Sequence, residues 1–249
     1  MTEPRDMEKA ALRGEPSWVW RAGQQRRLQM ILDAAGERVS GEVLENGCGV
    51  GEYLRRLQEY GGRVSGLDYD FERVQDTIAQ GLIAIQAAGE HLPYPANRFD
   101  LVISNEVIEH VQDDALAVSE IVRVLKPGGR LVLFCPNRGY PFETHGVYWR
   151  GKYRFGNIPL VNYLPDGLRN RLAPHVRIYR SRDLVALFTG LPVKQITRTV
   201  IYGGYDNLIA RLGLPGKWIR GLMQAFERSP LRWFGLSHYW VVEKTGDGS

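Results

Sequence analysis

The sequence predicts an α/β fold: a doubly wound, Rossmann-like sheet of about seven strands, mostly parallel with the last strand antiparallel, and helices on both faces. The first observation is an alternation of short apolar strands and amphipathic helices between residues 42 and 135, which requires βαβ crossovers and therefore a parallel sheet. The second is a glycine-rich turn between the first strand and the helix after it, the place where such sheets bind ligands. The third is the size, because 249 residues with 44% hydrophobic and 24% charged residues have the composition of one large globular domain.

Each element up to residue 135 is indicated by its periodicity or by the residues that end it. From Leu28 to Ala35 the apolar residues recur at i, i+3, i+4 and i+7, so 18–35 is expected to be a helix. Residues 99–104 are mostly Phe, Leu, Val and Ile, as in strands buried on both faces. Pro127 and the two glycines after it end the helix before the fifth strand. The expected strands are 42–45, 63–67, 82–86, 99–104 and 130–135, and the expected helices are 18–35, 52–60, 71–80 and 113–125.

Beyond Pro136 the alternation stops, and 137–180 is rich in aromatic residues, Arg, Pro and Gly without a clear period. A helix at 181–189 with Ser181 as its N-cap follows, and the last two expected strands are 193–202 and 238–244. We expect a frayed or disordered N-terminus at 1–17 and a single domain at 18–249, with substrate-lid insertions at about 137–180 and 203–236.

A further helix is expected to open at Pro215. Its apolar residues, among them Trp218 and Leu222, fall on one face, and basic residues lie opposite. A helix packed over the sheet is the favoured interpretation of this pattern, and a helix resting on a membrane interface is the alternative.

Composition and targeting signals favour a cytoplasmic protein. The sequence has no run of about 18 apolar residues that could span a membrane. Its first twenty residues are mixed and acidic, unlike a secretory signal. The two cysteines, Cys48 and Cys135, form neither a disulfide scaffold nor a CxxC metal pair.

Charge is divided unevenly along the chain. Residues 1–135 hold 15 Lys/Arg and 21 Asp/Glu, a balance of −6, whereas residues 136–249 hold 17 Lys/Arg and 7 Asp/Glu, a balance of +10; together they give the net +4. A basic half can attract an anionic substrate, a nucleic acid or a charged membrane surface. A solvated basic exterior explains the asymmetry equally well.

The segment from Glu45 to Gly51, which reads ENGCGVG, indicates a nucleoside-containing cofactor. Its glycines permit a sharp turn and a close approach of the backbone to a ligand. Asp68, at the end of the second strand and 21 residues after Gly47, can accept hydrogen bonds from two ribose hydroxyls. A dinucleotide is disfavoured, because the GxGxxG pattern needs glycine at position 52, where Glu52 would oppose a pyrophosphate.

At these residues the sequence resembles the class I S-adenosylmethionine-dependent methyltransferases. The resemblance is carried by LENGCGVGEYL, GLDYD, GEHLPYPANRFDLVISNEVIEHV and LKPGGRLVLFCPN, which cover about 43–137 in the order and spacing of the family. The opening segment SWVWRAGQQRRLQMIL is similar to the helical entry of a bacterial type 11-like branch of that family.

The resemblance implies S-adenosylmethionine as cofactor and assigns roles to individual residues. Glu45 would anchor the loop or the amino group of the cofactor, Asp68 would hold the ribose, Tyr69 would lie against the adenine, and Asn105 would lie on the sulfonium side. The residues implied to bind the cofactor are Glu45, Gly47, Cys48, Gly49, Gly51, Asp68, Tyr69, Ala88, Gly89 and Asn105. The family often has an acid where Ala88 stands, so Glu90 or the backbone would have to serve the adenine amino group.

The catalytic candidates follow the fourth and fifth strands. Glu106, Glu109 and His110 would share one face if they lay on a helix, and His145 comes shortly after the fifth strand. His145, His110 and Glu109 are the expected catalytic residues, because a hydroxyl nucleophile needs a base. With Glu106 they could also bind a divalent cation, as the resemblance to small-RNA 2′-O-methyltransferases and ubiquinone-pathway O-methyltransferases allows; a cation is left open and not expected.

The acceptor is expected to be a small molecule methylated on oxygen: a glycan, a lipid-linked compound or a quinone-like intermediate. Because residues 136–249 are basic, the acceptor could also be anionic. Interleaved aromatic and basic residues in 137–180 suit a substrate lid. An RNA methyltransferase with a metal-assisted site is the alternative enzyme, although no RNA-binding module is recognisable, and no DNA partner is expected. A cofactor-binding scaffold without turnover is the alternative from another class.

Overall fold

The computed structural model describes residues 19–246, so the expected frayed segment 1–17 lies outside the described residues. Its centre is a seven-stranded sheet in the order β10-β11-β5-β4-β1-β2-β3. Strand β11 runs antiparallel to both of its neighbours, and the other six strands run parallel to one another. The predicted fold class is therefore confirmed. The sheet strands are β1 (Glu42–Asn46), β2 (Arg63–Asp68), β3 (Ala84–Gln86), β4 (Phe99–Asn105), β5 (Leu125–Pro136), β10 (Val193–Ile201) and β11 (Ser237–Lys244).

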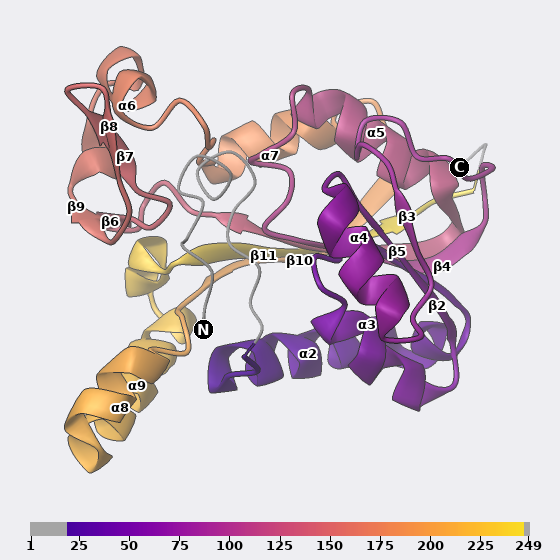
Figure 1. Ribbon diagram of the computed structural model, residues 1–249, viewed down its shortest axis with the longest axis horizontal. Coiled ribbons are helices and arrows are strands. Elements are labelled where there is room, and N and C mark those ends of the chain that lie inside the picture. The colour runs from indigo at the N-terminus through magenta and orange to yellow at the C-terminus, as the bar shows by residue number, and fades with distance from the viewer. Residues whose placement is uncertain (1–18, 247–249) are drawn as a thin grey trace.

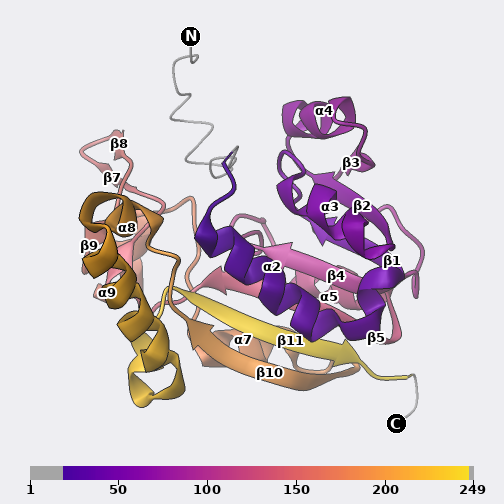
Figure 2. The same ribbon diagram turned by 90° about the horizontal axis from the view of Figure 1, so that it is seen from below.

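Helices cover both faces of the sheet, as Figure 2 shows. On one face α2 and α3 pack through side chains such as Leu28, Ile31 and Leu54. On the other face α5 and α7 pack through Val118, Ile121 and other apolar side chains. The helices that surround the sheet are α2 (Ala22–Ala35), α3 (Glu52–Leu57), α4 (Phe71–Ala79), α5 (Asp114–Val124) and α7 (Ser181–Phe188).

Several element boundaries differ from the predicted ones. The expected helix 52–60 is α-helical only to Leu57 and ends in a 3₁₀ turn, which leaves Tyr60 exposed. Ser181 is the first helical residue of α7 and not its N-cap, because the N-cap is Arg180, whose backbone N–H donates to Asp183 Oδ2 at 2.7 Å. The segment 106–110 forms turns after β4, so Glu106, Glu109 and His110 do not lie on a helix.

The strand order reverses beside β1, which has β4 on one side and β2 on the other. The carboxyl ends of these strands therefore form the crevice in which doubly wound sheets bind ligands.

The two expected insertions are folded segments outside the sheet (Figure 1). Residues 137–180 form a small lobe with two short antiparallel pairs, β6 with β9 and β7 with β8. Its elements are β6 (Phe142–Glu143), β7 (Val147–Trp149), β8 (Lys152–Arg154), β9 (Ile158–Pro159), the 3₁₀ turn η3 (Val161–Tyr163) and α6 (Asp166–Leu172). Residues 203–236 contain the helices α8 (Asp206–Leu212) and α9 (Leu214–Ala225), followed by the 3₁₀ turns η4 (Phe226–Arg228) and η5 (Pro230–Phe234).

The favoured interpretation of the helix at Pro215 was wrong. This helix, α9, packs on α8, where a Cβ on Gly216 would lie 2.8 Å from Ile209 Cα. Part of its apolar face is left uncovered: Trp218 is 79% exposed and Leu222 is 55% exposed. In Figures 1 and 2 the pair α8–α9 projects away from the sheet.

Candidate active site

The glycine loop after β1 is held against the end of β2 by backbone hydrogen bonds. The N–H groups of Gly47 and Cys48 donate to the carbonyl of Leu67 at 2.8 and 2.9 Å. The N–H of Gly49 donates to Asp68 Oδ2 at 2.8 Å. The loop and the carboxylate are therefore joined by hydrogen bonds at the crevice.

Each glycine of the loop is required for a different reason. Gly47, with φ +77°, would place a Cβ 2.3 Å from Val107 Cγ2. At Gly49, with φ +55°, a Cβ would meet no atom within 4 Å, so the backbone there faces open space that a ligand can approach. Gly51, with φ +80°, is the N-cap of α3 and would place a Cβ 2.7 Å from Leu82 Cδ1.

A cavity of about 1220 Å³ lies beside this loop. Sites for one small ligand usually measure about 300–1,000 Å³, so this cavity has room for a nucleoside cofactor together with an acceptor. Its walls include nine of the ten residues implied to bind the cofactor, and Gly51 is the one that does not line it. His145, His110 and Glu106 also line the cavity, whereas Glu109 is buried behind it.

The cavity wall fits a ligand that carries hydroxyl groups and a cationic amine. Asp68 presents a carboxylate whose Oδ2 and Oδ1 each accept a backbone N–H, from Gly49 and Asp70, and each oxygen retains a second lone pair. Glu45 Oε2 and both amide atoms of Asn46 are buried without a hydrogen-bond partner among the described residues. Burial raises the pKa of Glu45 well above its usual range, and the nearby Asp68 adds to this, so an adjacent cation would restore its charge.

The residues that the resemblance implies for the adenine line one and the same cavity. Tyr69, Ala88, Gly89 and Glu90 all line the cavity. The Glu90 carboxylate already accepts the backbone N–H of Gln112 at 2.6 Å. Glu90 therefore also holds the following loop in place, while Ala88 offers only its backbone.

Helix α2 contributes a wall that the sequence reasoning missed. Arg27 of α2 donates to Asn105 Oδ1 at 2.5 Å and to Glu106 Oε1 at 2.7 Å. Burial alone would raise the pKa of Glu106, but the Arg27 guanidinium outweighs it and holds the pKa below its usual value. Glu106 is thus an ion-pair partner of Arg27, and it is not among the three residues whose possible ligand atoms lie close together.

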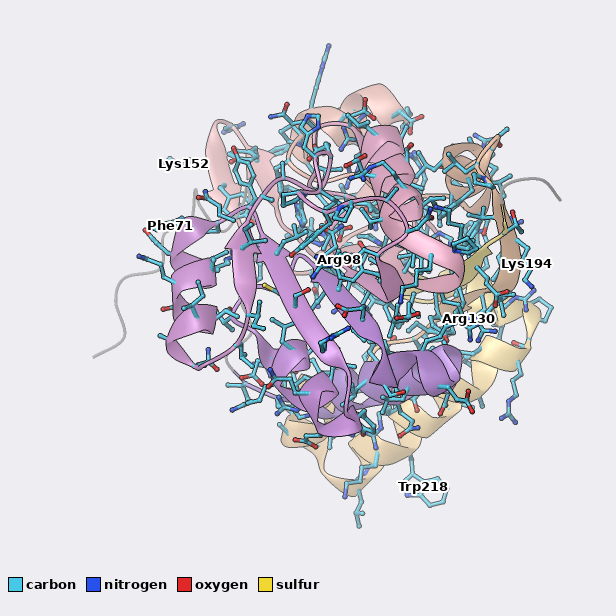
Figure 3. The ribbon with its side chains drawn as sticks, turned by 90° about the vertical axis from the view of Figure 1, so that its right-hand side faces the viewer. Phe71, Arg98, Arg130, Lys152, Lys194 and Trp218 are labelled. Carbon is cyan, nitrogen blue, oxygen red and sulfur yellow. The ribbon has the colours of Figure 1, made fainter. Side chains whose placement is uncertain are left out.

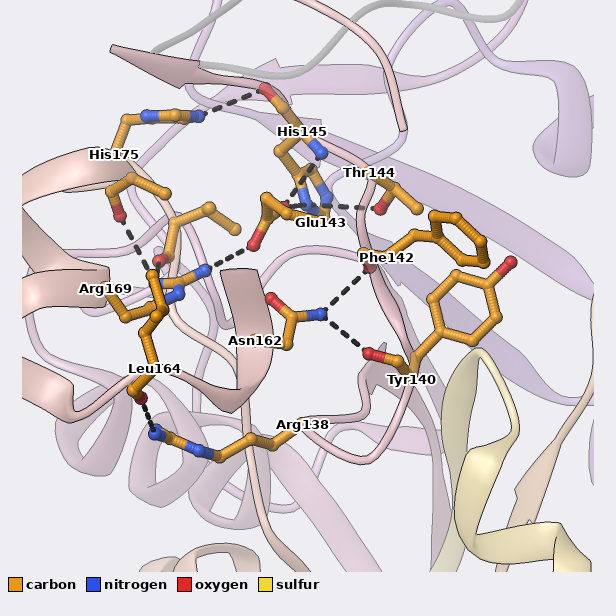
Figure 4. A network of polar contacts seen from close by, with 12 residues as sticks. Arg138, Tyr140, Phe142, Glu143, Thr144, His145, Asn162, Leu164, Arg169 and His175 are labelled. Carbon is orange, nitrogen blue, oxygen red and sulfur yellow. Dashed lines mark hydrogen bonds and ion pairs between the residues drawn. The ribbon is translucent and has the colours of Figure 1, made fainter. Parts of the chain in front are cut away.

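His145 is held by a buried carboxylate that the sequence reasoning did not single out. Its Nδ1 lies 3.1 Å from Glu143 Oε1, which also accepts the backbone N–H of His145 at 2.9 Å. The other oxygen of Glu143 accepts from Arg169 Nη2 at 2.6 Å, and both residues of this ion pair are 1% exposed. Figure 4 shows Arg169 and His145 on opposite sides of Glu143.

The protonation of this network follows from its contacts. Burial would raise the pKa of Glu143, but the hydrogen bond and charge of His145 and the charge of Arg169 lower it to about 2. The ionised carboxylate orders His145 as the Nδ1–H tautomer, so Nε2 is the ring nitrogen that bonds to none of residues 19–246. The only sequence signal for this arrangement is the carboxylate two residues before His145; Arg169 is too distant in the sequence to be recognised.

Glu109, His110 and His145 form a second cluster, in which one ligand atom of each lies within 4.8 Å of the others. Neither carboxylate oxygen of Glu109 has a hydrogen-bond partner among the described residues. Burial, and next the charge of Glu106, raise the pKa of Glu109 well above its usual value. Burial and the neighbouring His145 lower the pKa of His110 to about 4. A carboxylate and two neutral imidazoles in this arrangement could hold a divalent cation.

Only some residues of the two expected lid insertions, 137–180 and 203–236, line the cavity. From 137–180 the residues that line it are Thr144, His145 and Phe155. From 203–236 they are Gly203, Gly204, Asp206 and Leu236. The other aromatic residues of 137–180 lie within the small lobe or on its surface, as with Trp149, which is 51% exposed.

The fold and the site define a class: an α/β protein with a nucleoside-cofactor crevice at the switch point of its sheet. Residues 44–133 match the family model described as a methyltransferase domain. This match supports the resemblance to the class I S-adenosylmethionine-dependent methyltransferases and, with it, S-adenosylmethionine as the cofactor.

Individual relatives agree with this assignment. The chain is 38% identical over 116 residues to a probable S-adenosylmethionine-dependent methyltransferase of Mycolicibacterium smegmatis, an alignment that covers 45% of each chain. It is 28% identical over 176 residues to the ubiquinone biosynthesis O-methyltransferase of Serratia proteamaculans, with 68% of each chain covered. The chain thus spans a little under half the length of the first of these relatives.

Among solved structures, an S-adenosylmethionine-dependent methyltransferase from Mesorhizobium loti superposes with a TM-score of 0.62 at 20% identity, covering 90% of this chain and 98% of the other. This similarity establishes the fold. Within residues 19–246, none of the helices is long and apolar enough to cross a bilayer.

Proposed function

We propose that this protein transfers a methyl group from S-adenosylmethionine to a hydroxyl oxygen of a phenolic, quinone-like small molecule. The observation that carries the proposal is the buried Arg169–Glu143–His145 relay, which leaves one imidazole nitrogen of His145 at the cavity wall without a hydrogen-bond partner among the described residues. The relative from Serratia proteamaculans, named as a ubiquinone biosynthesis O-methyltransferase, supports a substrate of this chemical class.

In such a reaction, one group of residues would bind the cofactor and another would remove the proton of the acceptor. The cofactor, when bound, supplies a methyl group activated on a sulfonium. Asp68, Glu45 and the loop at Gly49 would hold it, since they form the wall with the free hydrogen-bonding capacity described above. Holding two reactants in line can lower a barrier by roughly 7–11 kcal/mol.

His145 would act as the general base. Its Nε2 takes the proton of the acceptor hydroxyl, so that the oxygen attacks the methyl carbon as an oxyanion. Glu143 keeps the ring in the required tautomer and stabilises the imidazolium that forms. Arg169 keeps Glu143 ionised, and therefore the relay supports proton removal from an O–H acceptor, which methylation of an amine lone pair would not require.

The test is a single-turnover assay with S-adenosylmethionine and a catechol-type prenylated quinol, followed by mass spectrometry for the added methyl group. We expect His145→Ala to lower turnover by about 10²–10⁴-fold, the usual contribution of a general base, with unchanged cofactor affinity by calorimetry. Asp68→Ala is the complementary variant, because it should lose cofactor affinity. Wild-type turnover in His145→Ala, or no methylated product from any hydroxylated acceptor while the cofactor binds, would reject the proposal.

A further inference from the structure

The helical pair α8–α9 presents an apolar stripe to solvent. Leu214, Trp218, Leu222 and Ala225 follow one another at i, i+4, i+8 and i+11 on one side of α9. The first three are 69%, 79% and 55% exposed. The opposite side of α9 is packed on α8 at Gly216, so the stripe is the outward face. Figure 3 shows the Trp218 side chain pointing away from the body of the molecule.

The charge around this stripe is strongly positive. Residues 206–234 contain five basic residues and two acidic ones. Both acids are turned toward α2: Asp206 accepts the N–H groups of Ala22 and Gly23, and Glu227 pairs with Arg26 at 2.6 Å. Within the described part of the chain, none of the five basic side chains forms a salt bridge; they are Arg211, Lys217, Arg220, Arg228 and Arg232.

We propose that the outward face of α9 is a docking site for an anionic lipid surface. Leucine and tryptophan side chains with unpaired basic neighbours are the combination by which an amphipathic helix lies in a lipid interface. Each basic residue near an anionic bilayer strengthens the attachment. A second copy of the chain fits less well, because it would place two cationic faces together.

The position of the helical pair connects this face to the cavity. The chain leaves β10 and returns to β11 through Gly203, Gly204, Asp206 and Leu236, and all four residues line the cavity. Docking through α9 would therefore bring the cavity close to the lipid surface. A membrane-embedded acceptor of the proposed reaction would gain from this, and that consequence rests on the proposed function; the docking itself does not.

The experiment is flotation of the full-length protein with vesicles of phosphatidylglycerol and phosphatidylcholine, compared with phosphatidylcholine alone. We expect the wild type to float with the anionic vesicles only. The double variants Trp218→Ser/Leu222→Ser and Lys217→Glu/Arg228→Glu should each bind about tenfold less or weaker still. Ile83→Ser is the matched control, since Ile83 is 67% exposed and does not line the cavity; it should float like the wild type.

Cofactor affinity by calorimetry verifies folding and separates the two proposals, since every variant should bind S-adenosylmethionine like the wild type. Equal flotation of the wild type and Trp218→Ser/Leu222→Ser would overturn the inference. A wild-type protein that does not float with the anionic vesicles would overturn it as well. So would a dimer, seen by sedimentation without vesicles, that the same double variant dissociates, because the stripe would then be a self-association surface.

Discussion

Glu143 is the residue on which the orientation of His145 depends, because its one carboxylate serves both His145 and Arg169. We predict that Glu143→Gln lowers kcat by about 10²-fold or more, because an amide can hold the wrong tautomer of the imidazole. The acceptor KM and the cofactor affinity should change little. Steady-state kinetics with calorimetry measures both, and Glu120→Gln serves as a control carboxylate that lies outside the cavity. Unchanged kcat in Glu143→Gln would remove the relay from the reaction.

Glu109 should lower the stability of the protein as pH rises. Its pKa is raised in the folded chain by burial and by Glu106, so the folded chain retains a proton that the unfolded chain releases. The contribution of the protonated Glu109 to the free energy of unfolding is fully present below the unfolded carboxyl pKa of about 4.3. It is lost as pH rises toward the pKa of Glu109 in the folded chain. Glu109→Gln should therefore raise Tm at pH 8 by about 2–4 °C or more, with no gain near pH 4.

Thermal unfolding between pH 4 and pH 8 in the presence of EDTA tests this. Glu106→Gln is the matched control with the opposite sign, because Arg27 lowers the pKa of Glu106 and the ion pair stabilises the folded chain above the unfolded pKa. If Glu109→Gln were no more stable than the wild type at pH 8, the carboxyl would have to be ionised and paired in the folded protein.

At the scale of single elements, substitutions at two glycines of the loop should have different effects, one mainly on protein stability and the other mainly on cofactor binding. We predict that Gly47→Ala destabilises the protein by about 1–3 kcal/mol, because its Cβ would meet Val107 at 2.3 Å. Gly49→Ala should cost about 1 kcal/mol for the left-handed backbone and weaken cofactor binding about tenfold, since its methyl group enters open cavity space. Chemical unfolding and calorimetry distinguish the two variants. Val107→Ala should recover stability in Gly47→Ala and leave Gly49→Ala unchanged.

The elements that could be predicted are those whose burial follows a simple period. Residues 99–104 are an almost continuous apolar run, as in a strand buried on both faces, and the apolar residues of 113–125 recur with the spacing of a helix; β4 and α5 follow these two predictions closely. The loop at Gly47 and the position of Asp68 could be predicted for the same reason, because spacing within a βαβ unit is fixed by its geometry.

The small lobe could not be predicted, because polar groups lie at its centre. Arg169 and Glu143 are fully buried there. The side-chain amide of Asn162 donates hydrogen bonds to the backbone carbonyls of Tyr140 and Phe142 at 3.1 and 2.9 Å. A polar core of this kind leaves no hydrophobic period in the sequence. The relay to His145 depends on this core, so the catalytic candidate could be named while its supporting carboxylate could not.

The orientation of α9 was mispredicted for a physical reason. An amphipathic pattern shows that a helix has an apolar face, but it does not identify what the face contacts. Here Gly216 allows α8 to approach the other side of α9, so the apolar face turns outward.

At the scale of the whole molecule, the cavity and the outward stripe should act together. We predict that anionic vesicles lower the KM for an acceptor with a polyprenyl tail and leave its tail-free analogue unaffected, because docking concentrates the enzyme where only the tailed acceptor resides. The variant Trp218→Ser/Leu222→Ser should lose this difference and keep its kcat. Kinetics with both acceptors, with and without vesicles, measures the effect, and an equal response of the two acceptors would contradict it.

The position of β11 has a consequence for how the chain folds. Strand β10 bonds within the sheet only to β11, and β11 bonds on its other side to β5. As the nascent polypeptide is made, β10 therefore has no place in the sheet until β11, which begins 36 residues after Ile201, has emerged. Assembly of this edge must wait for a contact between segments more than a hundred residues apart, such as His238 with Cys135, and such distant pairings form slowly. Until then the far edge of β5 stays open, which makes this interval the period in which the newly made protein depends most on protection from aggregation.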